Sequence, residues 1–164
     1  MILEKIKKLE DSKEFSSWKK DHKEAYLVHC FRMLDKQNEN IWQIGYFNPK
    51  THLISVFIVN ESITKGEDAE VFKEQEKLVN KLKVEDVKVS EDEALSKAKE
   101  ILNRDYKGST VFKAFMILQN IDEVGQVWNV TFITEQFKTV NVKIDSKDGK
   151  CISHKMVSLI QGTK

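Results

Sequence analysis

Two cysteines and four histidines are the residues of this sequence best suited to chemistry. Cysteine–histidine catalysis needs the thiol and the imidazole within hydrogen-bond distance of each other. His29 and Cys30 are neighbours on an expected strand, so their side chains point to opposite faces. On the same reasoning we expect Cys151 and His154 to point apart. The pattern predicts two separate structural thiols and no catalytic residue.

Metal binding finds little support in the same residues. The four histidines lack the short spacings of ligand pairs, and no Cys-x-x-Cys motif is present. Asp145, Asp148 and Gly149 superficially suggest a calcium loop, but the sequence lacks the oxygen ligands at alternate positions and the distal glutamate of an EF-hand. A type I turn with a left-handed glycine accounts for DSKDGK. We predict no metal and no cofactor, although a site assembled from distant strands stays open.

Composition excludes further classes of function. The 164 residues carry 27 basic and 26 acidic side chains, so the basic excess of a nucleic-acid-binding protein is missing. There is no Gly-rich phosphate loop and no Gly-x-Ser-x-Gly motif, and we predict that the protein is not an enzyme. No apolar run approaches the ~18 residues of a membrane span. The charged, amphipathic N-terminal sequence lacks the apolar stretch of a signal peptide, which predicts a cytoplasmic protein.

Hydrophobic periodicity predicts alternating helical and extended segments. Apolar spacing indicates helix over 2–20, either one bent helix or two short ones, with Asp11 and Glu14 as a possible internal cap. Ser90 and Glu93 form a capping box that opens a second helical stripe. Residues 60–89 are interpreted as a packed connector with a short strand near 70–73. Strands are expected at 25–34, 41–47, 53–59, 110–119, 126–134, 138–145 and 150–160.

An internal match links the two halves of the chain. IWQIGYF aligns with VWNVTFI at an offset of 86 residues (41 to 127), which places Trp42 on Trp128. Upstream the offset becomes 84 residues (31 to 115), with Phe31 on Phe115 and the difference assigned to a hairpin loop. These matches predict a tandem duplication, with a first unit over 1–83 and a second over 84–164.

The fold class that follows is α+β. Each unit is expected to be a three- to four-stranded antiparallel sheet covered on one side by a helix. The tryptophans are expected to be core residues. Strand parity assigns the core-facing residues. They are Trp42, Ile44, Tyr46, Ile54, Val56 and Ile58 in the first unit, and Trp128, Val130, Phe132, Val140, Val142 and Ile144 in the second.

The second half resembles the PepSY domain. The resemblance rests on the helix SEDEALSKAKEIL, the DYKG turn, VWNVTF and VNVKIDSKDGK, and it covers about residues 88–160. The first half matches only through the repeat, where FIVNESITKG has neither the aspartate nor the tight turn. The family implies binding or inhibition, including regulation of peptidases, rather than catalysis.

Two function classes follow from these observations. The first is a non-enzymatic binding module for a protein or peptide, engaged through a sheet face or edge, with a homodimer as one version. The second is a carrier of a small apolar ligand, for which a cavity of several hundred Å³ is the sign. Because successive side chains along a strand point to opposite faces, the residues that alternate with the core set define a candidate interaction surface on the sheet face away from the helices. Its residues are Phe47, Leu53, Phe57 and Val59.

Overall fold

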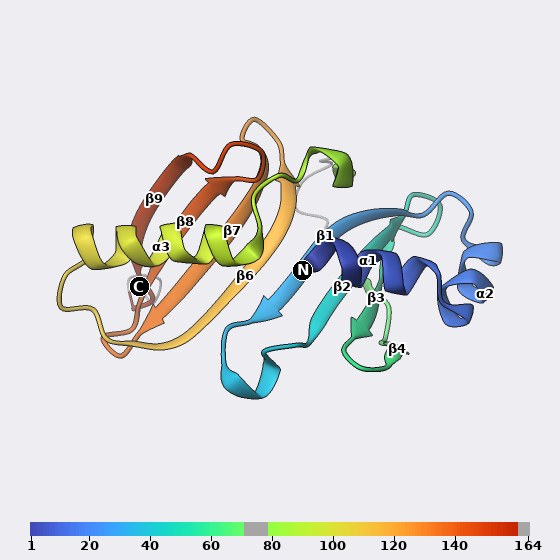
Figure 1. The fold of residues 1–164 in the computed structure, drawn as a ribbon, viewed down its shortest axis with the longest axis horizontal. Helices are drawn as coiled ribbons and strands as arrows, with labels where there is room; N and C mark the ends of the chain where they lie inside the picture. Colours follow the sequence, from blue (N-terminus) through green and yellow to red (C-terminus); the bar gives the residue numbers. More distant parts are fainter. Residues whose placement is uncertain (71–78, 161–164) are drawn as a thin grey trace.

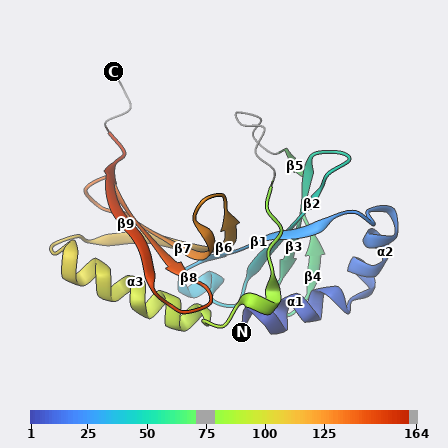
Figure 2. The same cartoon turned by 90° about the horizontal axis from the view of Figure 1, so that it is seen from above.

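The computed structural model of the protein describes residues 1–70 and 79–160. Within these residues the chain forms three α-helices and nine β-strands, and all nine strands belong to one antiparallel sheet. The helices lie along one side of this sheet, and no helix of the described part covers the other side (Figures 1 and 2). The fold is α+β, as the sequence predicts.

Two short helices open the chain, α1 (Ile2–Glu10) and α2 (Lys13–Asp21). The break between them comes from Ser12, whose hydroxyl accepts a hydrogen bond from the Phe15 amide at 3.1 Å. This contact satisfies one of the free amides that begin a helix. Ser12, and not Asp11, is therefore the N-cap of α2.

The first half of the sheet is a meander whose strands follow one another in chain order. It comprises β1 (Tyr26–Met33), β2 (Trp42–Asn48), β3 (Leu53–Val59) and the short β4 (Ile63–Lys65). A 3-10 helix, η1 (Lys36–Asn38), lies between β1 and β2. The two-residue strand β5 (Ala69–Glu70) also pairs with β3. It agrees with the start of the strand predicted near 70–73, whose remaining residues lie outside the described residues.

The second half repeats this order with longer strands. After the 3-10 helix η2 (Val84–Asp86), α3 (Glu91–Asp105) begins at the predicted capping box. There Glu93 accepts from the Ser90 amide, and Ser90 accepts from the Glu93 amide. The strands that follow are β6 (Val111–Ile121), β7 (Gly125–Thr134), β8 (Lys138–Asp145) and β9 (Cys151–Ser158).

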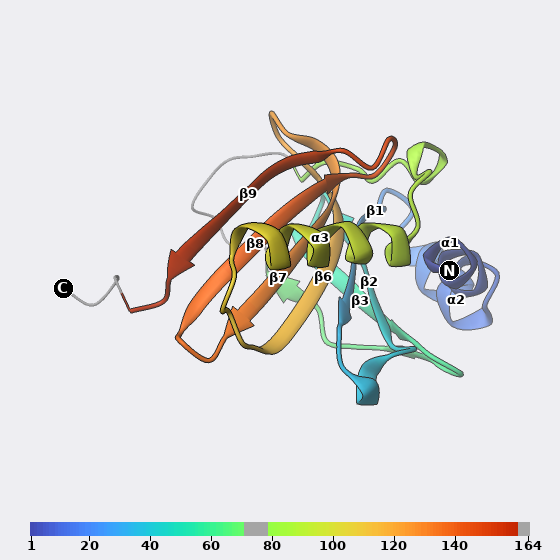
Figure 3. The same cartoon turned by 60° about the vertical axis from the view of Figure 1, so that its left-hand side comes forward.

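The halves join through their first strands. β1 pairs antiparallel with β6, which gives the strand order β4-β3-β2-β1-β6-β7-β8-β9. The predicted pair of sheets is therefore a single sheet. α1 packs against β2 and β3, whereas α3 packs against β7 and β8, as Figure 3 shows with α3 in front of these strands.

The pairing register corrects the upstream alignment of the two halves. Phe31 pairs with Gln43 in the first half, and Ile117 pairs with Asn129 in the second. Both partners move by 86 residues (31 to 117, and 43 to 129), so the 84-residue offset is wrong. Two strands with alternating apolar residues align equally well when one sequence is shifted by two residues. The alignment of Phe31 with Phe115 was therefore misleading. The duplication itself stays a prediction.

A one-residue difference in the next turn reverses the predicted faces of β3. Phe47 pairs with Ile54, whereas Ile133, its equivalent, pairs with Thr139, so the second turn is one residue shorter. Because side chains alternate along a strand, a shift of one residue exchanges the two faces. The helix-facing residues of β3 are Ser55, Phe57 and Val59, and those on the opposite side are Ile54, Val56 and Ile58.

The two halves share one hydrophobic core centred on two tryptophans. Trp42 and Trp128 are 2% and 0% exposed, and their ring centroids lie 6.2 Å apart. The Trp128 indole also donates to the carbonyl of Val89 at 2.9 Å. Trp18 is buried as well, so all three tryptophans are core residues, as the sequence predicts.

Truncation of either central tryptophan tests this core. We expect Trp128→Ala to lower the free energy of unfolding by about 3–5 kcal/mol, and Trp42→Ala by a similar amount, because each leaves a large cavity. Denaturant titration measures both changes. A loss under ~1 kcal/mol for either variant would contradict the shared core.

Candidate functional site

The sheet side that faces away from the helices, called the open face, is the first candidate surface. Cross-strand pairing defines one complete row across it, from β3 to β8. Residues directly opposite each other in an antiparallel sheet share a face, so the row fixes the composition of the open face. Its members in order are Ile58, Gln43, Phe31, Ile117, Asn129 and Lys143.

The centre of the open face is apolar. Phe31 on β1 lies beside Phe115 on β6, with ring centroids 5.7 Å apart, and Phe31 pairs directly with Ile117. These three side chains form an apolar strip, and Val56 and Ile58 on β3 add to it across Gln43 and Gly45 of β2. All five side chains are half-buried. Contiguous apolar residues on an uncovered sheet face are typical of interaction surfaces.

A hollow of about 290 Å³ lies in the middle of this strip. It is lined by Phe31, Ile117, His29, Gln43 and Gln119. Gly45 makes room for the imidazole, because a Cβ atom at that position would stand 2.2 Å from Cε1 of His29. The hollow is suited to receive one apolar side chain, with the amides of Gln43 and Gln119 beside it.

Burial keeps the His29 ring neutral. It lowers the pKa of His29 below its ordinary value of 6.5. A buried imidazole loses hydration when it becomes charged, and this cost opposes protonation. The wall of the hollow is therefore uncharged at neutral pH.

The part of the open face on β7 and β8 is polar and ordered by side-chain hydrogen bonds. Asn141 donates to Asn129 at 2.5 Å and to Thr131 at 3.0 Å, and Lys143 donates to Asn141 at 2.7 Å. Burial and the nearby Lys155 lower the pKa of Lys143. No carboxylate of the described residues lies within ion-pair distance of either lysine, so this end of the open face carries positive charge.

The four residues predicted as the interaction surface are placed differently by the structure. Phe57 and Val59 are fully buried under the helices, and Leu53 has the same strand parity. Phe47 alone belongs to the open face, where it is buried against Tyr26 with ring centroids 5.7 Å apart. Of the four predicted residues, only Phe47 lies on the sheet face that was predicted. The other three are on β3, whose two faces are exchanged by the extra residue in the turn before it.

The residues that do form the apolar strip were missed at the sequence level. Alternation along β1 could have indicated them, because Cys30 faces the helices while His29 and Phe31 face the other side. A register shift between Leu27 and His29 interrupts this alternation. Phe115 and Ile117 follow once β1 and β6 are paired. That long-range pairing cannot be read from local pattern.

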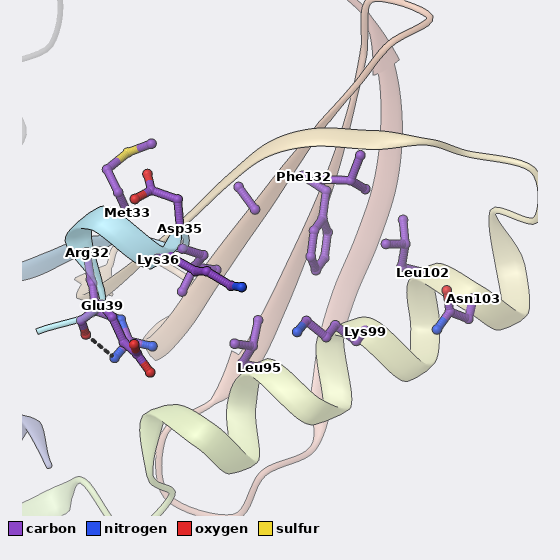
Figure 4. A pocket seen from close by; sticks show the side chains of 13 residues that line it. Arg32, Met33, Asp35, Lys36, Glu39, Leu95, Lys99, Leu102, Asn103 and Phe132 are labelled. Atoms are coloured by element: carbon purple, nitrogen blue, oxygen red, sulfur yellow. Dashed lines mark hydrogen bonds between the residues drawn. The ribbon is translucent and has the colours of Figure 1, made fainter.

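A second candidate site is a groove of about 720 Å³ on the helix side of the sheet, between α3 and the β1–β2 connection (Figure 4). Its floor is apolar, and Figure 4 shows Phe132 reaching from β7 toward α3. Its rim carries charged side chains from η1, β1 and α3. The apolar residues are Met33, Leu34, Leu95, Leu102, Val111, Ala114 and Phe132, and the polar residues are Arg32, Asp35, Lys36, Glu39, Lys99 and Asn103.

The cysteines offer no activated nucleophile. Cys30 is fully buried on the helix side while His29 points to the open face, and burial raises the Cys30 pKa well above its usual range. A protonated thiol is a poor nucleophile. Burial also raises the pKa of Cys151.

The expectation that Cys151 and His154 point apart is wrong. The register of β8 with β9 shifts at Ile152, so Cys151 pairs opposite Ile144 and His154 opposite Val142, which share the helix side. A bulge of this kind adds one residue and cancels the alternation. The His154 Nδ1 then lies 2.8 Å from the hydroxyl of Tyr106 at the end of α3.

Metal and calcium sites find no support in the described part of the chain. Over residues 1–70 and 79–160, no group of three or more His, Cys, Asp or Glu side chains is arranged to hold a metal ion. The DSKDGK segment is a turn in which Asp145 accepts from the amides of Lys147 and Asp148. Gly149 has a left-handed φ of 77°, as predicted for this turn.

Comparison with known proteins gives one structural neighbour. No protein-family model matches the sequence, and no curated protein matches it. A solved structure of a protein named a "putative lipoprotein" from Clostridium difficile 630 is similar, with a TM-score of 0.57 and 13% identity. The match covers 88% of this chain and 90% of the other, and at this identity it supports the fold alone. Among the described residues, no helix has the length and apolar character needed to cross a membrane.

Opposite faces of β3 give a matched test of the corrected register. Phe57 packs against Phe15, Trp18 and Tyr46, with ring centroids 5.1–6.0 Å away. We expect Phe57→Glu to unfold the protein, because it buries an unpaired charge. The adjacent Ile58→Glu should cost only about 1 kcal/mol by denaturant titration. The opposite ranking would restore the original face assignment.

The neutral His29 predicts a pH dependence of stability. Its pKa is lower in the folded than in the unfolded state, so the unfolded state binds more protons between the two values. Its contribution is complete above about pH 6.5 and is lost as the pH falls below that value. We expect His29→Gln to flatten the drop in melting temperature between about pH 7 and pH 5. The exposed His52→Gln serves as a control and should leave that drop unchanged, and equal slopes for all three proteins would refute the assignment.

Proposed function

We propose that this chain is a non-enzymatic binding module that engages a protein partner through the open face of its sheet. The observation that carries the proposal is the hollow of about 290 Å³ at the centre of an apolar strip on a sheet face that the described helices leave uncovered. Protein interfaces concentrate their binding energy where an aromatic or aliphatic anchor fills such a hollow.

The composition of the open face indicates the chemistry of the partner. The apolar strip of Phe31, Phe115 and Ile117 suits an apolar anchor side chain. Lys143 and Lys155 lie beyond it on β8 and β9, and no carboxylate of the described part lies within 4.0 Å of either ammonium group. We infer a partner with an exposed apolar anchor flanked on one side by acidic groups, since complementary charge guides and orients association.

The polar network beside the strip supports this role. Asn129, Thr131 and Asn141 are already hydrogen-bonded to one another before any partner arrives. Side chains that are fixed in advance lose less conformational entropy on binding. A rigid sheet therefore provides a surface that needs little rearrangement.

The groove beside α3 favours a second candidate function, carriage of a small ligand with an apolar part. Its volume of about 720 Å³ lies within the range of ligand pockets, and its floor is apolar. The resemblance to PepSY domains, a peptidase-regulating role and a cytoplasmic location stay predictions from the sequence.

A charge placed in the hollow tests the protein-binding proposal. We expect Ile117→Asp to abolish capture of the partner from an extract of the source organism, while the protein stays folded. With the purified partner the affinity should fall by at least about 30-fold, equivalent to the roughly 2 kcal/mol of an interface anchor. Calorimetric titration gives the affinity, and thermal unfolding confirms that the variant is folded.

Thr64→Asp on the edge strand β4 provides the matched control on the same face. Thr64 pairs with Ile58 on the same face but lies outside the hollow and outside the polar network, so this variant should retain at least a third of the affinity. Equal binding by Ile117→Asp and the unmodified protein would refute the proposal. A homodimer of the purified chain that Ile117→Asp dissociates, seen by sedimentation, would also refute it, because the occupant would then be a second copy.

A further inference from the structure

We propose that the groove between α3 and the β1–β2 connection binds a single-chain amphiphile with an anionic head group. This inference is independent of the protein-binding proposal and names the ligand class for the second candidate function. It rests on the unused positive charge at the rim of the groove together with the apolar floor.

Two lysines at the rim lack acidic partners. Lys36 extends from η1 toward α3, and Lys99 projects from α3 into the same space (Figure 4). Over the described residues neither ammonium group has a carboxylate within 4.0 Å, and neither donates a hydrogen bond to another side chain. Two ammonium groups that face one space from different elements can both approach one anion.

Arg32 adds a third cation with unused hydrogen-bonding capacity. Its guanidinium lies 5.1 Å from the centre of the Trp42 ring and donates to the Glu39 carbonyl at 3.3 Å. Its Nε is buried and has no hydrogen-bond partner in the described part. A guanidinium has five N–H donors in a planar fork that matches the oxygens of a carboxylate or phosphate.

The two acidic residues of the rim offset only part of this charge. Asp35 is engaged within η1, where its carboxylate accepts from the amide and the side chain of Asn38 at 2.7–2.9 Å. Glu39 forms no ion pair within 4.0 Å with any described residue. Three cations against two acids leave a positive rim.

The apolar floor continues inward from this rim. Leu95 and Leu102 on α3 face Phe132 on the sheet across the groove. Ala114 pairs with Phe132 and lines the same groove. An alkyl chain lying here would remove apolar surface from water, which favours binding. The arrangement of charge outside and apolar surface inside is that of an amphiphile-binding site.

Titration with three probes of equal chain length tests the head-group preference. We expect decanoate and decyl phosphate to bind at least about 10-fold more tightly than 1-decanol, all below their micelle-forming concentrations, and 0.5 M salt to reduce that difference. Calorimetry gives the affinities. NMR shift changes should appear at Leu102 and Ala114 but not at Ile117 on the open face. The tighter of the two acids identifies the head group.

Charge and shape variants separate the parts of the proposal. Lys36→Gln with Lys99→Gln should remove most of the preference for the acids, whereas Lys107→Gln with Lys138→Gln removes two exposed charges elsewhere and should change nothing. Ala114→Phe should fill the groove and abolish binding of all three probes, while Ala69→Phe on β5 should not.

Equal affinity for decanol and decanoate would overturn the anionic head group. Absence of binding by every probe, or shifts confined to the open face, would overturn the groove as a ligand site. Ile117→Asp should bind decanoate normally, so failure of this inference and failure of the protein-binding proposal are distinguishable.

Discussion

The contact between Trp42 and Trp128 is the interaction on which the rest of this structure depends. The two indoles come from different halves of the chain and meet beside the β1–β6 junction, 6.2 Å apart. α1 covers β2 and β3, and α3 covers β7 and β8. The tryptophans therefore link two helix-covered regions into one core. Neither half alone would bury its tryptophan to the same degree, and burial of large aromatic surface is the main favourable term in folding.

The same arrangement produces both candidate sites. Because the three helices of the described residues lie on one side, none of them covers the apolar strip at Phe31 and Ile117 on the opposite side of the sheet. On the helix side, α3 and the β1–β2 connection approach the junction without closing over it, and the groove lies between them. The core itself is filled by large side chains such as Trp42, Trp128 and Phe57. Function is thus expected at surfaces of the sheet and not in its interior.

Local sequence patterns predicted the elements well but failed where the number of residues in a turn or bulge decides the geometry. The capping box at Ser90, the seven longer strands and the burial of the tryptophans follow from patterns within one segment. β3 is apolar on both faces, so alternation could not orient it, and the turn before it is one residue longer than the turn after β7. The extra residue at Ile152 likewise brought Cys151 and His154 to one side.

The sheet face away from the helices was predicted as the candidate surface, but the residues at its centre and the groove could not be predicted from the sequence, because both depend on the pairing of β1 with β6. That contact joins residues such as Phe31 and Ile117, which are distant along the chain. Nothing in either strand specifies the other as its neighbour. The helix-side cations of the groove were equally hidden, since Arg32 and Lys99 look like ordinary surface charges in the sequence.

Native-state hydrogen exchange of the backbone amides tests most directly whether the nine strands form one cooperative sheet. We expect the amides of β1 and β6 at the junction, including those of Phe31 and Ile117, to exchange only by global unfolding. Their opening free energy should equal the slowest in β2 and β7. If one half opened at a lower free energy while the other stayed protected, the halves would be independent units and the shared core would be contradicted.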